Sequence, residues 1–250
     1  MSKTLNKIKP LVDKTIKELA EKKDFELDPI LGKRYGLQTS ILASAQRRHG
    51  LIIEHAMLEY AKTLKGILAW EDKSFYIHDQ VAPVVEVMLS HELMKMAKDK
   101  LKKDDEVTRN EIKEMEIKYH TPETAPSFVF EKRQLDLLIY DKKNKTLNSY
   151  EVKRGNSYHD SQKKKGIIKA LWSTQFLLKS YGEFKGLEIK NVKAYCIFYY
   201  GKGSLGREGN KEFRLMGDEI DEHFGHPFSQ EIDSATDYFR DSLWKMLSSI

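Results

Sequence analysis

Acidic side chains lie inside two short segments of this chain that read as strands, and this feature constrains the fold more than any other. Asp136 is flanked on both sides by apolar residues in the run 135–140. Glu151 lies near the end of a second short run, 148–153, and the residues between the two runs are mostly polar, as in a turn. The pattern predicts two adjacent strands joined by a tight turn.

The period of a strand places the charged residues of these segments on one face. Side chains alternate across a strand, so Glu151 and Lys153 point to one side while Val152 points to the other. Asp136 on the neighbouring strand can join them. Two carboxylates and one ammonium on one sheet face can hold a divalent cation and orient a water for phosphodiester cleavage.

An Asp followed on the next strand by Glu-x-Lys resembles the PD-(D/E)XK nuclease superfamily, which includes most type II restriction endonucleases. Leu135 stands where the family name has Pro, a position that varies within the superfamily. The resemblance implies that Asp136 and Glu151 bind Mg²⁺, with Mn²⁺ as a substitute, and that Lys153 helps to activate water and stabilise charge on the phosphate. It also implies an α/β fold with a restriction-endonuclease-like core, a mixed central sheet flanked by helices, and a helical N-terminal portion.

The order of elements expected along the chain fits such a core. Apolar residues at helical spacing predict helices at residues 5–23, 37–66, 84–101, 161–181 and 230–249. Strands are expected at 128–130, at the two segments described above, and at 192–200. We therefore expect an N-terminal helical extension, 1–36, and a nuclease domain, 37–250, with a helical insertion around 67–125.

Glu54 is a third carboxylate that the resemblance brings into the site. It lies on the predicted helix 37–66, and Gly50 stands one turn earlier on the same face. A glycine there allows close approach to a neighbouring backbone. Many restriction endonucleases carry a similar Gly and Glu on a helix beside the sheet, which implies that Glu54 supports the metal and the catalysis. The alternative is an ordinary exposed helix glutamate, with Glu59 as the comparison.

Basic residues cluster in sequence around these candidates. They are Arg47, Arg48, Arg154, Lys163, Lys164 and Lys165. Phosphate contacts supply most of the non-specific affinity for DNA and require basic residues of this kind. We interpret these residues as DNA-binding, and the alternative for each is a solvated surface. Gln162 and Gln175 are candidates either for contact with the active-site region or for structural roles.

Composition sets broader limits. Of 250 residues, 40% are hydrophobic and 32% are charged, which suffices for one core with a solvated surface. The net charge of +5 favours a polyanionic partner only weakly, because acidic residues are also abundant. Cys196 is the single cysteine and is expected in the core, so no disulfide within the chain is possible. Without a recognisable signal peptide or membrane span, a cytoplasmic location is expected.

Two motifs that point to other chemistry are rejected. Residues 201–206 match G-x-G-x-x-G after a predicted strand, but polar residues follow instead of the apolar helix that a dinucleotide site requires. His91 and Glu92 begin like a zinc-protease motif, but Lys95 stands where the second histidine is needed. We therefore expect no nucleotide cofactor.

The resemblance thus implies a magnesium-dependent endonuclease that cuts double-stranded DNA, most similar to a sequence-specific type II restriction enzyme. A homodimer is expected, since two-fold symmetry matches a palindromic site. The nearest alternative is a structure-specific repair, recombination or phage nuclease. A DNA-binding module on the same fold is the non-enzymatic alternative, and cleavage that depends on a metal would discriminate the two classes.

Overall fold

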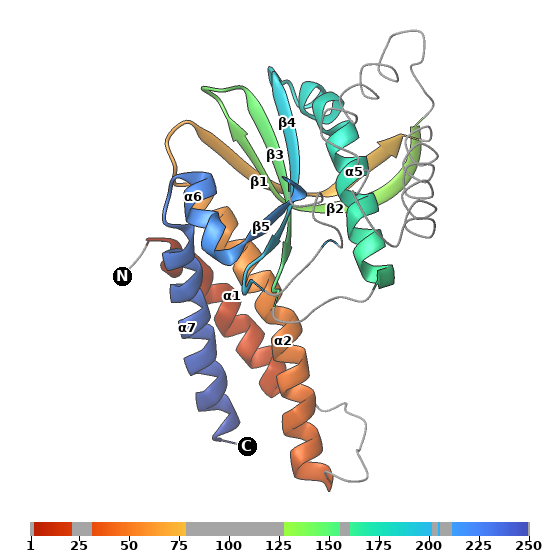
Figure 1. Ribbon diagram of the computed structural model, residues 1–250. Coiled ribbons are helices and arrows are strands. Elements are labelled where there is room, and N and C mark those ends of the chain that lie inside the picture. The colour runs from red at the N-terminus through yellow and green to blue at the C-terminus, as the bar shows by residue number, and fades with distance from the viewer. Residues whose placement is uncertain are drawn as a thin grey trace, which may run out of the picture. The chain divides into compact units, whose positions relative to one another are not determined.

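The computed structural model of the chain describes residues 3–21, 32–78, 128–155, 161–201, 205 and 212–249 (Figure 1). The chain divides into two compact units. We call Met1–Thr63 together with Ile220–Ile250 the helical unit, and Leu64–Glu219 the sheet unit. The boundary expected between residues 36 and 37 falls inside one helix, whereas the two ends of the chain belong to the same unit.

Helices alone form the described part of the helical unit. They are α1 (Lys3–Ala20), α2 (Gly32–Ala61), α6 (Ile220–Phe224) and α7 (Phe228–Leu247). They confirm, with shifted ends, the helices expected at 5–23, 37–66 and 230–249. α1, α2 and α7 pack on one another through apolar side chains at helical spacing. Buried examples are Ile8, Val12, Ile53, Met57 and Ile232.

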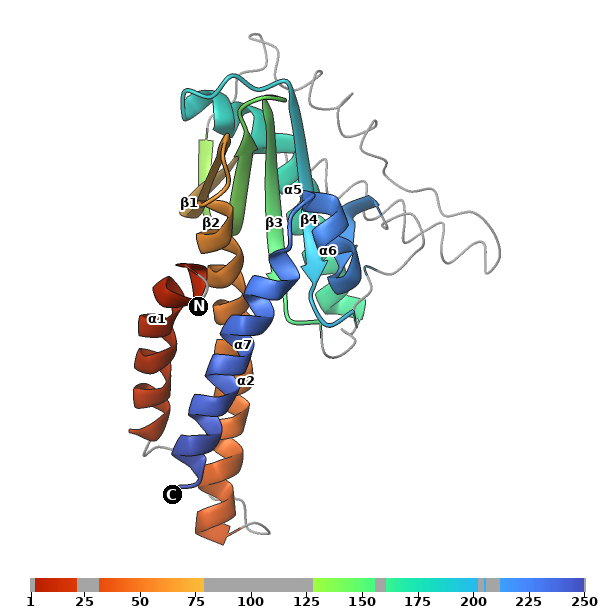
Figure 2. The same cartoon turned by 90° about the vertical axis from the view of Figure 1, so that its left-hand side faces the viewer.

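A five-stranded mixed sheet forms the centre of the sheet unit. In spatial order its strands are β1 (Ile67–His78), β2 (Phe128–Asp141), β3 (Thr146–Lys153), β4 (Asn191–Phe198) and β5 (Arg214–Met216). β1, β2 and β3 are antiparallel neighbours, whereas β3, β4 and β5 are parallel. The helix α5 (Ser161–Phe184) runs along one face of this sheet (Figure 2). The predicted α/β class and mixed sheet are therefore confirmed.

β1 occupies residues that the sequence analysis placed in a helical insertion around 67–125, so that part of the prediction is wrong. Its register with β2 shifts repeatedly, first between Trp70 and Asp72, and such shifts break the alternation by which strands are recognised. The strand expected at 128–130 is the start of β2. The helix expected at 84–101 lies outside the described residues. The strands expected at 128–130 and 135–140 are therefore one strand, and three strands precede α5 only because β1, which was not expected, adds one.

A hydrogen-bonded network fixes β1 to α5. The indole N–H of Trp70 donates to the hydroxyl of Tyr181 at 3.0 Å, and that hydroxyl donates to the carboxylate of Asp72 at 2.6 Å. The ammonium of Lys185 lies 3.2 Å from the same carboxylate. The side chain of Asp72 is only 12% exposed, so these partners satisfy a charge that would otherwise be costly inside the unit.

One apolar core joins the sheet to α5. Its members include Leu138, Leu147, Leu171, Trp172, Cys196 and Phe198. The thiol of Cys196 is fully buried among them, which confirms the expectation that it packs in the core. No helix in the described ranges is long and apolar enough to cross a membrane.

Gln175 on α5 completes the hydrogen bonding of β4 where β5 does not reach. β5 pairs with β4 only at residues 196–198. Nearer the start of β4, the side-chain Nε2 of Gln175 donates to the carbonyl of Val192 at 2.9 Å, and its Oε1 accepts from the N–H of Ala194 at 2.8 Å. The amide thus replaces a strand partner, and Gln175 is a structural residue that holds α5 in register with the sheet.

Replacing Gln175 with Leu should lower the free energy of unfolding by about 2–4 kcal/mol, because two buried backbone groups would be left without partners. Urea titration of the full chain measures this change. Gln162→Leu, at an exposed position of the same helix, should change it by no more than about 0.5 kcal/mol. Equal effects of the two substitutions would contradict the structural role of Gln175.

Candidate active site

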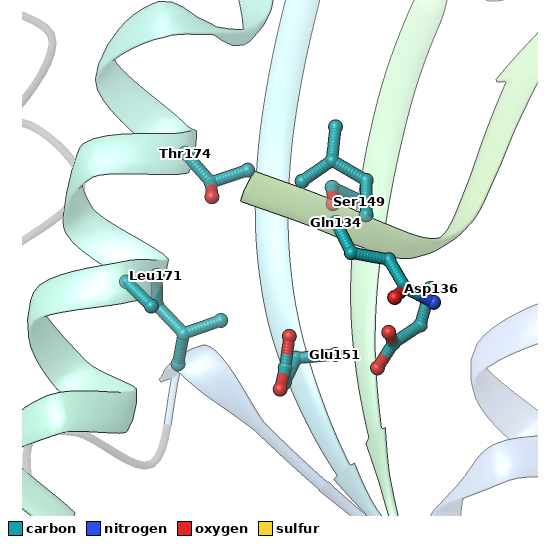
Figure 3. A pocket seen from close by; sticks show the side chains of 8 residues that line it. Gln134, Asp136, Ser149, Glu151, Leu171 and Thr174 are labelled. Atoms are coloured by element: carbon teal, nitrogen blue, oxygen red, sulfur yellow. The ribbon is translucent and has the colours of Figure 1, made fainter. Parts of the chain in front are cut away.

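The pairing of β2 with β3 brings Asp136 and Glu151 together. Leu137 pairs with Tyr150, and one further step along the antiparallel ladder sets Asp136 opposite Glu151. Both side chains lie on the face of the sheet that α5 covers (Figure 3). The N–H of Val152 donates to Oδ2 of Asp136 at 3.1 Å and orients that carboxylate. The juxtaposition predicted from the strand period is therefore present.

A small pocket lies between these two carboxylates and α5 (Figure 3). Its volume is about 30 Å³, which is enough for a water molecule. The lining residues are Gln134, Leu135, Asp136, Ser149, Glu151, Ala170, Leu171 and Thr174. Buried Ser149 and Thr174 add hydroxyl groups to the two carboxylates, so polar groups converge on a small, largely apolar space.

Lys153 is ion-paired with Glu151, and their side chains are 28% and 29% exposed. β3 lies between β2 and β4, so Lys153 does not lie on an edge strand of this sheet. Burial alone would lower the pKa of Lys153, but the charge and hydrogen bond of Glu151, together with the charge of Asp136, raise it well above its ordinary value. Lys153 is therefore a permanent cation at physiological pH.

Asp136 is in the opposite situation, because its environment disfavours its charge. Burial and then the negative charge of Glu151 raise the pKa of Asp136 to about 6, with a smaller contribution from Glu71. Lys153 and the N–H of Val152 act in the opposite direction without cancelling the shift. The carboxylate pair is thus short of positive charge, which is the electrostatic condition that favours cation binding.

Asp136→Asn should therefore stabilise the metal-free protein at pH 7.5. The folded-state pKa of Asp136 is about 6 against its ordinary value of 3.8, so ionisation opposes folding increasingly between these pH values and fully above them. Below pH 3.8 Asp136 is protonated in both the folded and the unfolded protein, so the substitution should no longer change the free energy of unfolding. Urea titrations with EDTA should show a gain of about 1–3 kcal/mol at pH 7.5 and almost none near pH 4.

Asp141→Asn is the matched control, with the opposite sign. Hydrogen bonds from the N–H groups of Lys143 and Asn144 and from the Asn144 amide outweigh burial and lower the pKa of Asp141. The ionised Asp141 carboxylate therefore stabilises the fold at every pH above its pKa in the unfolded protein. That stabilisation is lost as the pH falls through its lower pKa in the folded protein. The Asp141 variant should lose stability at pH 7.5. If Asp136→Asn also lost stability there, the electrostatic interpretation of the pair would be refuted.

The donor set fits a hard divalent cation. Mg²⁺ is usually held by one or two carboxylates with water and substrate oxygens completing its shell, and Asp136 and Glu151 supply two carboxylates. Among the described residues no group of three or more His, Cys, Asp or Glu side chains could hold a metal. Water, backbone carbonyls or a phosphate oxygen would therefore have to provide the remaining ligands.

Glu54 lies on α2 in the helical unit, whereas the carboxylate pair lies in the sheet unit. Its role in the site remains a prediction. Within the helical unit an added Cβ at Gly50 would meet no described atom within 4 Å, and close approach of this face to the sheet stays a prediction. Glu59 is not a neutral comparison either, since it is ion-paired with Lys7 at 3.1 Å and with Lys62 at 2.6 Å.

The basic residues of α2 have structural partners within the helical unit. Arg48 forms an ion pair with Glu18 on α1. The neighbouring His49 is buried, and its Nε2 lies 3.0 Å from the hydroxyl of Thr236 on α7. Arg47 is exposed. An interhelical partner thus accounts for Arg48 without DNA, and Arg47 is the better placed of the two for contact with a phosphate.

The other predicted DNA-binding residues lie in the sheet unit with the carboxylate pair. Lys163, Lys164 and Lys165 occupy the first turn of α5, where Lys163 and Lys165 are exposed. Arg154 follows Lys153, and its guanidinium lies 5.8 Å from the ring centroid of Tyr200. Contact of these four residues with phosphate remains a prediction.

Three polar residues of the pocket were not identified from the sequence. Gln134 and Ser149 stand two residues before Asp136 and Glu151, so the strand period already places them on the same face. Thr174 has no such signal, because only the packing of α5 brings it to the pocket. Comparison with protein-family models, with curated proteins and with solved structures found no match.

Proposed function

We propose that this chain is a metal-dependent endonuclease of the PD-(D/E)XK type that hydrolyses phosphodiester bonds of DNA. The observation that carries the proposal is the placement of Asp136 and Glu151 on adjacent strands with Lys153 on the same face. The order of strands and helix around this pair supports a restriction-endonuclease-like core.

Asp136 and Glu151 would hold Mg²⁺, or Mn²⁺ in its place, and Glu54 would support them. The bound ion would polarise the phosphate and lower the pKa of a nearby water. Lys153 has a different task from a general base, because its ammonium carries no free lone pair and its raised pKa keeps it protonated. It donates hydrogen bonds, either to the attacking water or to the phosphate oxygen on which negative charge develops.

The substrate proposed for this site is double-stranded DNA, cut by a homodimer in the cytoplasm in the manner of a type II restriction enzyme. Arg47, Arg154 and the lysines at the start of α5 would contact phosphates. By resemblance, the products carry 5′-phosphate and 3′-hydroxyl ends. Incubation of a long mixed-sequence DNA with the protein and Mg²⁺, followed by end mapping, tests both the cleavage and its sequence specificity.

Asp136→Asn and Glu151→Gln should each abolish this cleavage while DNA binding is retained, because removal of a negative charge near the phosphates does not weaken binding. The measurement pairs cleavage in Mg²⁺ with binding in Ca²⁺. Glu188→Gln, an exposed carboxylate of the same unit, is the control and should cut normally. A variant that keeps more than about a tenth of the activity, roughly 1.4 kcal/mol in barrier, would remove its residue from the site.

Lys153→Ala should lower the single-turnover rate by about 10²–10³-fold, as expected when a hydrogen-bond donor to developing charge is removed. DNA affinity should change little. Replacement of both Lys163 and Lys164 by Ala should have the converse effect, with weaker binding and a flatter dependence on salt. A loss of affinity alone in the Lys153 variant would assign this residue to binding rather than to the chemical step.

A further inference from the structure

Strand register continues the row of the candidate site across the sheet to Arg214. β3 pairs with β4 so that Glu151 is opposite Cys196, and β4 pairs with β5 so that Cys196 is opposite Arg214. Residues directly opposite in register point to the same face. Cys196 belongs to the core under α5, and Met216, two residues after Arg214 on the same strand, packs against that core. Arg214 therefore shares the face of the carboxylate pair.

One donor of the Arg214 guanidinium is not accounted for by the fold. Its Nε is buried and has no hydrogen-bond partner among the described residues. Two other charged groups on this face have internal partners, since Lys153 is paired with Glu151 and Asp72 accepts a hydrogen bond from Tyr181. A buried donor without a partner costs about 1–3 kcal/mol, and more when it is charged, so its retention is best explained by a ligand that the protein binds.

The spacing suits two phosphates a short distance apart on one nucleic-acid strand. Adjacent strands of a sheet are about 4.7–4.9 Å apart, so the backbone of Arg214 lies roughly 10 Å from that of Glu151. A DNA strand carries one phosphate for about every 3.4 Å of helix axis. A DNA strand held at the carboxylate pair can therefore present another phosphate to Arg214. A planar guanidinium group can donate two parallel hydrogen bonds to one phosphate.

We propose that Arg214 binds a backbone phosphate near the one held at Asp136 and Glu151, and so helps to position the DNA strand at the site. This inference rests on the proposed function, because it requires a nucleic-acid strand at the carboxylate pair. Arg214 acts on the position and affinity of the substrate, whereas Lys153 acts on the reacting phosphate itself.

Binding of a DNA duplex in Ca²⁺, without cleavage, tests the proposal over a range of salt concentrations. Arg214→Gln should weaken binding and reduce the slope of log affinity against log salt by about 0.9, the value expected when one phosphate is no longer neutralised. The Arg214→Lys variant should keep the wild-type salt slope, because its charge remains. It should bind DNA less tightly, because an ammonium group cannot form the bidentate hydrogen bonds of a guanidinium. Lys193→Gln removes the same charge from an exposed position on the opposite face and should leave the slope unchanged.

The outcomes separate this inference from the proposed cleavage. A slope reduced in Arg214→Gln but not in Lys193→Gln supports the binding of phosphate by Arg214, even where the wild-type protein cuts no DNA and the cleavage proposal fails. An unchanged slope overturns it, even where the wild-type protein cuts DNA. The melting temperature without DNA should hold in Arg214→Gln, because its Nε has no internal partner to lose; a large fall with an unchanged slope would make Arg214 a structural residue.

Discussion

The conflict between Asp136 and Glu151 is the interaction on which the rest of this site depends. Two carboxylates on neighbouring strands beneath a helix repel one another, and burial deprives them of the water that would screen that repulsion. The single ammonium of Lys153 compensates only in part, because it is paired with Glu151 and leaves the pKa of Asp136 raised. A fold gains nothing in stability from such a pair, and this is why a cation ligand is its natural explanation.

The surrounding structure is built to keep this strained arrangement in place. Gln175 and the Trp70–Tyr181–Asp72 network attach α5 to separate strands of the sheet, so the pocket over the carboxylates has a fixed wall. Gly155 follows the strand that carries Glu151. Its φ is +68°, and a Cβ there would lie 2.9 Å from the backbone of Phe198, so only glycine permits this backbone conformation two residues after Lys153.

Strand alternation was sufficient to predict the central constellation, because Asp136, Glu151 and Lys153 lie on short regular strands. It failed at β1, where register shifts break the alternation, and it could not reveal a helical unit assembled from both ends of the chain. Thr174 and Arg214 were missed for a related reason. Each reaches this face only through packing or register with elements distant in sequence, and no local pattern encodes that placement.

The charges on this face explain why the proposed ion and the proposed substrate belong together. Arg214 lies two strands from Glu151 and leaves the pKa of Asp136 raised, but together with Lys153 and the two carboxylates it gives this face a formal charge of zero before an ion binds. A divalent cation would make it positive, and a phosphodiester gains negative charge as it approaches its transition state. In the proposed function the carboxylates would supply the affinity for the ion, while the two basic residues would leave its charge available to the phosphate. A site of acidic residues alone would bind the ion more tightly and attract DNA less.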